Sequence, residues 1–205
     1  MKILVLDNYD SFTYNLVQYI TELTGTTPSV FRNDEISLDD VEAYDAIVLS
    51  PGPGLPNEAG IMPALIKRYA PTKAIFGVCL GLQAIGEAFG GELYNLPKVF
   101  HGVATVIQVI DNQELIFKNI PNEVLVGRYH SWAVKSENLP AELKITATAD
   151  GGKTIMAMSH RTYNVRGVQF HPESIMTDYG KQMLKNFFEP LSKKTMKSNA
   201  IEYVF

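Results

Sequence analysis

One short stretch, residues 74–83, limits what this chain can fold into more than any other part of the sequence. It opens with an apolar run typical of a buried strand, and a helical pattern follows directly. Between them lies Gly77-x-Cys79-x-Gly81, the arrangement of a nucleophile elbow with sulfur in place of oxygen. Glycine on both sides permits a sharp turn. Cys79 is therefore predicted to project from a strand end at a helix N-terminus, where free amides favour a thiolate.

Composition and charge exclude several classes of protein. The 205 residues include 18 Lys and Arg against 22 Asp and Glu, a formal net charge of −4, which argues against a nucleic-acid partner. The single cysteine excludes an internal disulfide framework and agrees with a reducing compartment. Asp7 comes too early for a signal peptide, and every apolar run is shorter than the ~20 residues of a membrane span. We therefore expect a cytoplasmic protein that has no membrane partner.

The order of strand and helix patterns predicts the fold class. Strands are predicted at residues 3–6, 28–31, 46–49, 74–79, 103–110, 124–126, 143–149, 154–160 and 165–170, and helices at 12–23, 61–69, 80–89 and 179–191. The first half alternates strand and helix, which indicates an open, mostly parallel sheet with helices on both faces. The second half is rich in strands, and Gly151-Gly152 indicates a hairpin, so a smaller antiparallel group is expected there. We predict one domain over residues 1–191 and a polar tail over 192–205.

A catalytic cysteine needs a base, and His171 is the preferred candidate among four histidines. It follows the apolar run 165–170, so it also lies at a strand end. Pro172 favours an extended chain, in which His171 and Glu173 point to the same side. The carboxylate would then orient the imidazole, which leaves the other ring nitrogen for the Cys79 thiol. The alternative is a surface His–Glu pair beside a buried, inert cysteine.

Acyl transfer also needs donors for an oxyanion. The backbone amide of Leu80 follows the nucleophile at the helix start and is the first candidate. The second is the amide of Gly52 or a neighbour in the rigid loop Pro51-Gly52-Pro53-Gly54, which follows the predicted strand 46–49. A plain tight turn is the alternative for this loop. No zinc site is expected, because a second cysteine and a His-Glu-x-x-His helix are both lacking.

Along residues 1–190 the chain resembles the class I, triad-type glutamine amidotransferases, whose fold is flavodoxin-like. The motifs that carry the resemblance are residues 50–54, 77–83 and 168–174, in this order and spacing. The resemblance implies hydrolysis of glutamine to glutamate and ammonia. Cys79 would form a γ-glutamyl thioester, His171 would protonate the departing ammonia and then activate water, and Glu173 would orient His171.

The same resemblance implies a binding site for glutamine. Gln83, one helical turn past the nucleophile, is similar to the family residue that holds the amino-acid end of the substrate. Residues 129–132 resemble the family's Tyr-His-Ser-Leu, which implies backbone contacts from Ser131 and Trp132, although Trp132 departs from the usual leucine. No cofactor and no metal are expected in this subunit, whereas the family's partner synthase uses Mg.

The opening, residues 6–15, resembles the amidotransferase subunits that serve chorismate-using synthases. The expected partner is component I of anthranilate synthase, in tryptophan biosynthesis. The alternative partner is aminodeoxychorismate synthase, in folate biosynthesis. Residues 128–131 favour the tryptophan enzyme. Two further alternatives are a stand-alone α/β cysteine hydrolase and a non-catalytic scaffold subunit.

Overall fold

The structure is a computed structural model that describes residues 1–202, with side chains as far as Lys193. Its helices are α1 (Thr13–Thr24), α2 (Met62–Tyr69), α3 (Leu80–Ala88) and α4 (Gly180–Glu202). Its strands are β1 (Ile3–Asp7), β2 (Ser29–Arg32), β3 (Ala46–Leu49), β4 (Ala74–Val78), β5 (Leu93–Asn95), β6 (Val103–Val109), β7 (Glu123–Arg128), β8 (Trp132–Val134), β9 (Leu143–Ala149), β10 (Thr154–His160) and β11 (Val165–Val168). Short 3₁₀ turns are η1 (Asp40–Ala43), η2 (Pro56–Glu58), η3 (Leu115–Phe117) and η4 (Asp150–Gly152).

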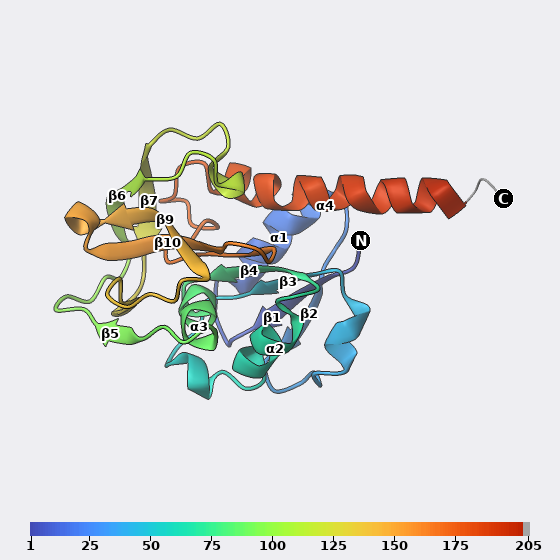
Figure 1. The fold of residues 1–205 in the computed structure, drawn as a ribbon, viewed down its shortest axis with the longest axis horizontal. Coiled ribbons are helices and arrows are strands. Elements are labelled where there is room, and N and C mark those ends of the chain that lie inside the picture. Colours follow the sequence, from blue (N-terminus) through green and yellow to red (C-terminus); the bar gives the residue numbers. More distant parts are fainter. Residues whose placement is uncertain (203–205) are drawn as a thin grey trace.

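Nine of the described strands form one sheet in the order β2-β1-β3-β4-β11-β10-β9-β6-β7 (Figure 1). Strands from β2 to β11 pair in parallel, and those from β11 to β7 pair antiparallel. The predicted fold class is thus confirmed, including the antiparallel group in the second half. β4 and β11 lie side by side although about ninety residues separate them, with Val78 opposite Val168. This pairing brings the two strands that precede Cys79 and His171 together.

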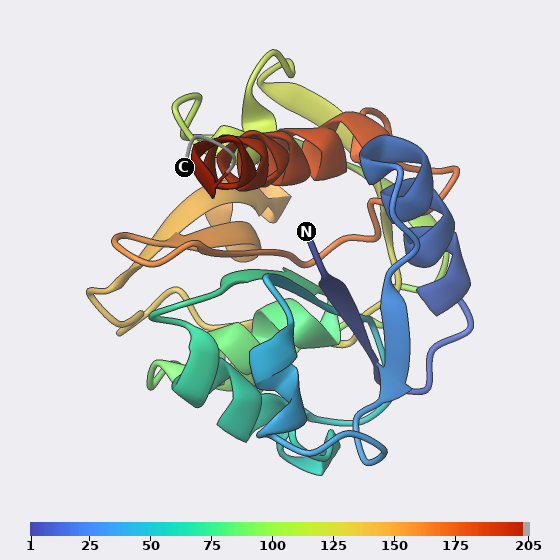
Figure 2. The same cartoon turned by 90° about the vertical axis from the view of Figure 1, so that its right-hand side faces the viewer.

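Helices cover both faces of the parallel half of the sheet (Figure 2). Alternate residues of β1 belong to different core clusters: Ile3 and Val5 join the cluster that contains α1 and α4, whereas Leu4 and Leu6 join the cluster that contains α2 and α3. Because both faces are buried, the strand reads as an uninterrupted apolar run. That is the physical reason why the short runs of the first half predict strands correctly.

Two features differ from the sequence-based expectation. The last helix was predicted to end at residue 191, but α4 continues to Glu202 (Figure 1). The polar stretch after Pro190 has no glycine to stop a helix, and a helix that is already nucleated can extend without an apolar face of its own. Residues 203–205 of the predicted tail lie outside the described residues. The second difference is a small antiparallel sheet of β5 and β8, whose three-residue strands are too short to give a pattern.

None of the helices in the described residues is long and apolar enough to cross a membrane.

Candidate active site

Cys79 forms the junction between β4 and α3 with an unusual backbone conformation. Its φ of 52° and ψ of −99° lie in a region that costs a non-glycine residue energy, and such strain is typical of functional turns. The turn itself is made by Cys79, whereas the glycines on either side are needed for close packing. A Cβ on Gly77 would lie 2.5 Å from the carbonyl carbon of Gly81, and a Cβ on Gly81 would lie 2.7 Å from the Leu49 oxygen. The start of α3 therefore packs directly against β4 and β3, and neither glycine has room for a side chain.

His171 lies just past the end of β11 and pairs with Glu173. Its Nδ1 is 2.6 Å from Oε1 of Glu173, and both side chains are buried. The predicted pairing is therefore present, but the predicted extended chain is wrong. A turn, closed by a hydrogen bond from the Ser174 amide to the His171 oxygen, brings the two side chains together. Pro172 is the second residue of this turn, a position that proline favours.

The pKa of His171 depends on Cys79 as well as on Glu173. Burial by itself lowers the pKa of His171, but Cys79 and Glu173 together raise it to about 10. Nε2 of His171 has no hydrogen bond of normal geometry within the described residues, yet the Cys79 sulfur is close enough to contribute to this rise. Because Nδ1 is engaged by Glu173, Nε2 is the ring nitrogen that remains for the thiol. The arrangement therefore places a protonated imidazole beside the Cys79 sulfur.

Cys79 is also contacted by a glutamine that the sequence analysis did not single out. Nε2 of Gln169 lies 3.5 Å from the Cys79 sulfur, and Gln169 is fully buried. Its side-chain oxygen accepts a hydrogen bond from Gln83 at 3.2 Å, and Gln83 also donates to the backbone oxygen of Trp132 at 2.9 Å. The structure thus joins Gln83 and Trp132, both predicted to bind glutamine, to the nucleophile. The sequence feature that could have indicated Gln169 is its position as a polar residue in the apolar run before His171.

The proline-glycine loop lies against the start of α3. A Cβ on Gly52 would be 2.4 Å from the Asn8 backbone oxygen and 3.0 Å from the Leu80 side chain, so this loop contacts the residue that follows the nucleophile. Pro53 and Gly54 are exposed. The loop is braced by Glu58, whose carboxylate accepts a hydrogen bond from the Leu55 amide at 2.8 Å. The structure therefore brings the two predicted sources of oxyanion donors together, while their role stays a prediction.

The segment that carries His171 is attached to β7, the last strand of the sheet. The His171 amide donates to the Gly127 oxygen at 3.1 Å, and the Asp178 amide donates to the Leu125 oxygen at 2.9 Å. The Gly127 amide in turn donates to the Thr177 hydroxyl at 3.0 Å. These bonds fix both ends of residues 171–178, so the position of the base depends on the sheet edge.

Comparison with known proteins agrees with this geometry. The family described as glutamine amidotransferase class-I matches residues 4–191. The chain belongs to this family. It is 50% identical over 191 residues to anthranilate synthase component 2 of Pseudomonas aeruginosa, covering 90% of this chain and 94% of that protein. It is 46% identical over 196 residues to aminodeoxychorismate/anthranilate synthase component 2 of Bacillus subtilis, covering 95% and 99%.

Among solved structures, a protein from Thermoplasma acidophilum described as part of a putative GMP synthase superposes with a TM-score of 0.85 at 27% identity. The superposition covers 97% of this chain and 98% of that one.

Aromatic rings form one wall of this amidotransferase site. The Tyr129 ring lies 4.8 Å from the His171 ring, and the Phe12 ring lies 5.8 Å from His171 and 5.4 Å from Tyr129. The spacing of Phe12 matches the apolar face of the predicted helix 12–23, which by itself indicates a core residue. Its position just before α1 turns it towards the base instead. The rings shield the His171–Glu173 pair from water.

Ser131 and Trp132 are half-buried at the start of β8, and the preceding residue, His130, is buried. Burial lowers the pKa of His130 to about 4, so this imidazole is neutral. Its Nε2 accepts a hydrogen bond from Nε of Arg128 at 3.1 Å, and Nδ1 therefore donates to the Trp132 oxygen at 2.8 Å. The Trp132 oxygen thus receives hydrogen bonds from both His130 and Gln83. In the part of the chain that the structure describes, no cluster of three or more His, Cys, Asp or Glu residues could hold a metal.

Proposed function

We propose that this chain is the glutaminase subunit of a chorismate-using synthase, and that Cys79, His171 and Glu173 are its catalytic residues. The observation that carries the proposal is the buried His171–Glu173 pair beside the strained elbow of Cys79, in a member of the glutamine amidotransferase family. Each group has the environment that its step requires: a nucleophile at a helix N-terminus and a base held in one orientation by a carboxylate.

The reaction begins with attack of the Cys79 thiolate on the carboxamide carbon of glutamine. The C–S bond forms, and the oxyanion is met by backbone amides at Leu80 and at the Gly52 loop, which are close neighbours. The His171 imidazolium gives its proton to the departing ammonia as the C–N bond breaks, and a γ-glutamyl thioester remains. Neutral His171 then takes a proton from water, which attacks the thioester and releases glutamate.

Glutamine would be held beside Cys79 by Gln83, Ser131 and Trp132. The support is the hydrogen-bond chain from Cys79 through Gln169 and Gln83 to the Trp132 oxygen. These contacts fix the backbone of β8 relative to the sulfur, as a site that must align a carboxamide with a nucleophile requires.

The partner we propose is component I of anthranilate synthase, which would use the ammonia to aminate chorismate. Relatives named as second components of such synthases support this choice. Exposed apolar side chains near the catalytic turn add to it: Ile175 is 99% exposed, and Tyr14, Tyr9 and Tyr179 are also exposed. The nearly complete exposure of Ile175, four residues after His171, makes it a candidate contact for a protein partner. The Bacillus subtilis relative, whose name covers both synthases, keeps aminodeoxychorismate synthase as the second candidate.

The decisive experiment is the Cys79→Ala variant, assembled with each synthase component in turn. We expect product formation from glutamine to be lost, whereas product formation from added ammonium continues. The product, anthranilate or aminodeoxychorismate, identifies the pathway. Loss of both activities in an intact complex would contradict ammonia transfer. Labelling of Cys79 by a glutamine-like electrophile that glutamine does not prevent would favour the stand-alone hydrolase.

A further inference from the structure

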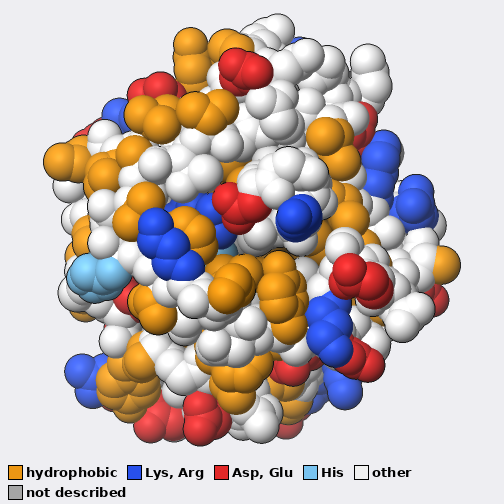
Figure 3. Space-filling view, turned by 90° about the vertical axis from the view of Figure 1, so that its left-hand side faces the viewer, with side chains coloured by type: hydrophobic (Ala, Val, Ile, Leu, Met, Phe, Trp, Pro, Cys, Tyr) orange, Lys and Arg blue, Asp and Glu red, His pale blue; other side chains and the backbone are white. Residues whose placement is uncertain are grey.

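A cavity of about 830 Å³ lies on the antiparallel side of the molecule, apart from the Cys79 site. Its walls come from the segment that follows β5, from residues 135–137 after β8, and from the η4 turn between β9 and β10. Its volume falls within the range of about 300–1,000 Å³ that is common for small-molecule sites. Figure 3 views the molecule from this side, where Lys and Arg side chains stand beside hydrophobic ones. The size of this cavity is enough for a metabolite.

The walls define the chemistry of a ligand. Tyr94 and Phe100 supply aromatic rings, and Leu96 and Pro97 add apolar surface. The cations that line the cavity are Lys98, Lys135 and Lys153, and the carboxylates are Glu137 and Asp150. Asp150 is already engaged, because it accepts hydrogen bonds from Arg128 and from Thr154. An apolar ring with a negative group therefore matches these walls better than a cation does.

Asp150 connects this cavity to a buried cation. Its two oxygens lie 3.2 and 3.1 Å from Nη1 of Arg128, a side chain with no exposed surface. The guanidinium carbon lies 3.5 Å from the centre of the Phe100 ring, and Nη2 of Arg128 has no hydrogen-bond partner among the described residues. Asp150 begins the η4 turn with a φ of 55°, in the left-handed region that aspartate adopts more readily than most residues.

From Arg128 a continuous path of hydrogen bonds leads to the nucleophile. Arg128 Nε donates to His130, His130 donates to the Trp132 oxygen, and the same oxygen accepts from Gln83. Gln83 donates to Gln169, whose Nε2 points to the Cys79 sulfur. The Phe100 ring, which lines the cavity, also stacks on His130 with ring centres 5.6 Å apart. A change at Asp150 or Phe100 therefore acts on the backbone of Trp132.

We propose that this cavity binds a small aromatic anion and that its occupancy is transmitted to the glutamine site through Arg128 and His130. The ring packs against Phe100, and the negative group lies at Lys98 and Lys153. An anion on the same wall as Asp150 repels that carboxylate and weakens its hold on Arg128. His130 then loses its orienting donor, and the Trp132 carbonyl is less well placed for glutamine. The transmission rests on the proposed glutaminase function, whereas the binding does not.

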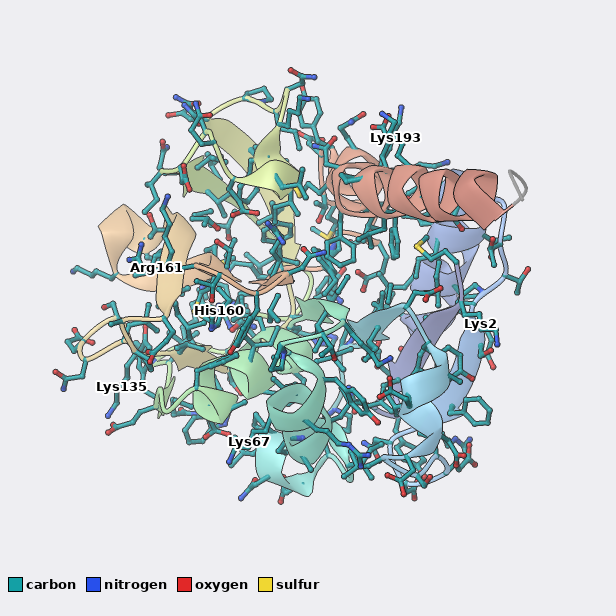
Figure 4. All side chains as sticks on the ribbon, turned by 45° about the vertical axis from the view of Figure 1, so that its right-hand side comes forward. Lys2, Lys67, Lys135, His160, Arg161 and Lys193 are labelled. Atoms are coloured by element: carbon teal, nitrogen blue, oxygen red, sulfur yellow. The ribbon has the colours of Figure 1, made fainter. Side chains whose placement is uncertain are left out.

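Binding is tested first, with benzoate as the probe and the full chain in a calorimetric titration and in an NMR titration of backbone amides. We expect saturable binding that moves the amides of residues 150–154, and weaker binding of cyclohexanecarboxylate and of benzyl alcohol. Lys98→Glu should weaken benzoate binding about tenfold or more. The matched control is Lys67→Glu, which changes an exposed lysine on α2 (labelled in Figure 4) that does not line the cavity, and it should leave binding unchanged. Absence of saturable binding, or equal affinity in Lys98→Glu, would overturn the site.

Transmission is tested with the assembled complex. Saturating benzoate should raise the KM for glutamine about fivefold or more, within the usual range of allosteric coupling, and should leave the ammonium-dependent reaction unchanged. The effect should be absent in Lys98→Glu and retained in Lys67→Glu. Bound benzoate with an unchanged KM would overturn the transmission. A complex that binds benzoate but never uses glutamine would instead contradict the proposed function and leave the binding site established.

Discussion

Gln169 donates to the sulfur of Cys79, the proposed nucleophile, which His171 also neighbours. The same carboxamide holds Gln83, so one buried side chain joins the nucleophile to the predicted substrate-binding residue. A donor at this position would stabilise negative charge on the sulfur in the proposed reaction. Hydrogen bonds to charged groups contribute about 1.5–3 kcal/mol.

The first prediction concerns this contact. Gln169→Leu should lower kcat/KM for glutamine about ten- to a hundredfold, because about 1.4 kcal/mol corresponds to a factor of ten. Product formation from ammonium in the assembled complex should not change. Gln18→Leu, on the exposed face of α1, is the matched control. An unchanged kcat/KM would mean that His171 alone sustains the thiolate.

The second prediction concerns Glu173. Glu173→Gln removes a charge that raises the pKa of His171, so NMR titration of this imidazole should give a value below about 10. The kcat for glutamine should fall by roughly 10² or more, since the base loses its orienting anion. A folded pKa above the unfolded value of about 6.5 stabilises the protein below pH 6.5, and this contribution is lost as pH rises through about 10.

The loss of stability between pH 6.5 and 10 should therefore be smaller in Glu173→Gln than in the unchanged chain. Chemical denaturation at several pH values measures it. Parallel curves for the two proteins would contradict the coupling between Glu173 and His171.

The third prediction follows from the buried, neutral His130. Its pKa of about 4 lies below the unfolded value of about 6.5, so its contribution to stability is complete above pH 6.5 and is lost as pH falls towards 4. The shift corresponds to roughly 3 kcal/mol in the free energy of unfolding. His130→Gln should flatten the acid side of the stability curve. Chemical denaturation of the variant and of the unchanged chain at several pH values measures this slope, and equal slopes would contradict the prediction.

The fourth prediction concerns the packing of the elbow. Gly81→Ala should lower the free energy of unfolding by about 2–3 kcal/mol, because the new Cβ would lie 2.7 Å from the Leu49 oxygen and backbone must move. Glu87→Ala, at an exposed position of the same helix, should be close to neutral or stabilising. Urea denaturation of both variants gives the comparison, and equal stabilities would show that α3 shifts freely.

The sequence was sufficient where the relevant interactions are local. The predicted strands 143–149 and 154–160 agree with β9 and β10 at both ends, since apolar and β-branched residues predominate in them and a glycine turn separates them. The His171–Glu173 pair was also found, because its members are two positions apart. The turn between them was not, since proline suits a turn as well as an extended chain.

Contacts between distant residues could not be predicted in this way. Gln169 is ninety residues from Cys79, and nothing near a buried carboxamide indicates which partner it has. Likewise, Phe12 fits the apolar pattern of α1 although its ring packs against His171. The path from Asp150 to Trp132 depends on the folding of Arg128 beneath Phe100, which no spacing in the sequence encodes.

The attachment of residues 171–178 to β7 has a consequence for self-association. β7 ends the sheet, and an uncovered terminal strand is a template on which another chain can add a strand. Here the backbone groups of Leu125 and Gly127 already form hydrogen bonds with the segment that carries His171, the proposed base. Release of residues 171–178 would therefore displace His171 and, at the same time, expose the edge of β7 to pairing with another chain. In this protein, an intact active site and resistance to aggregation depend on the same few hydrogen bonds.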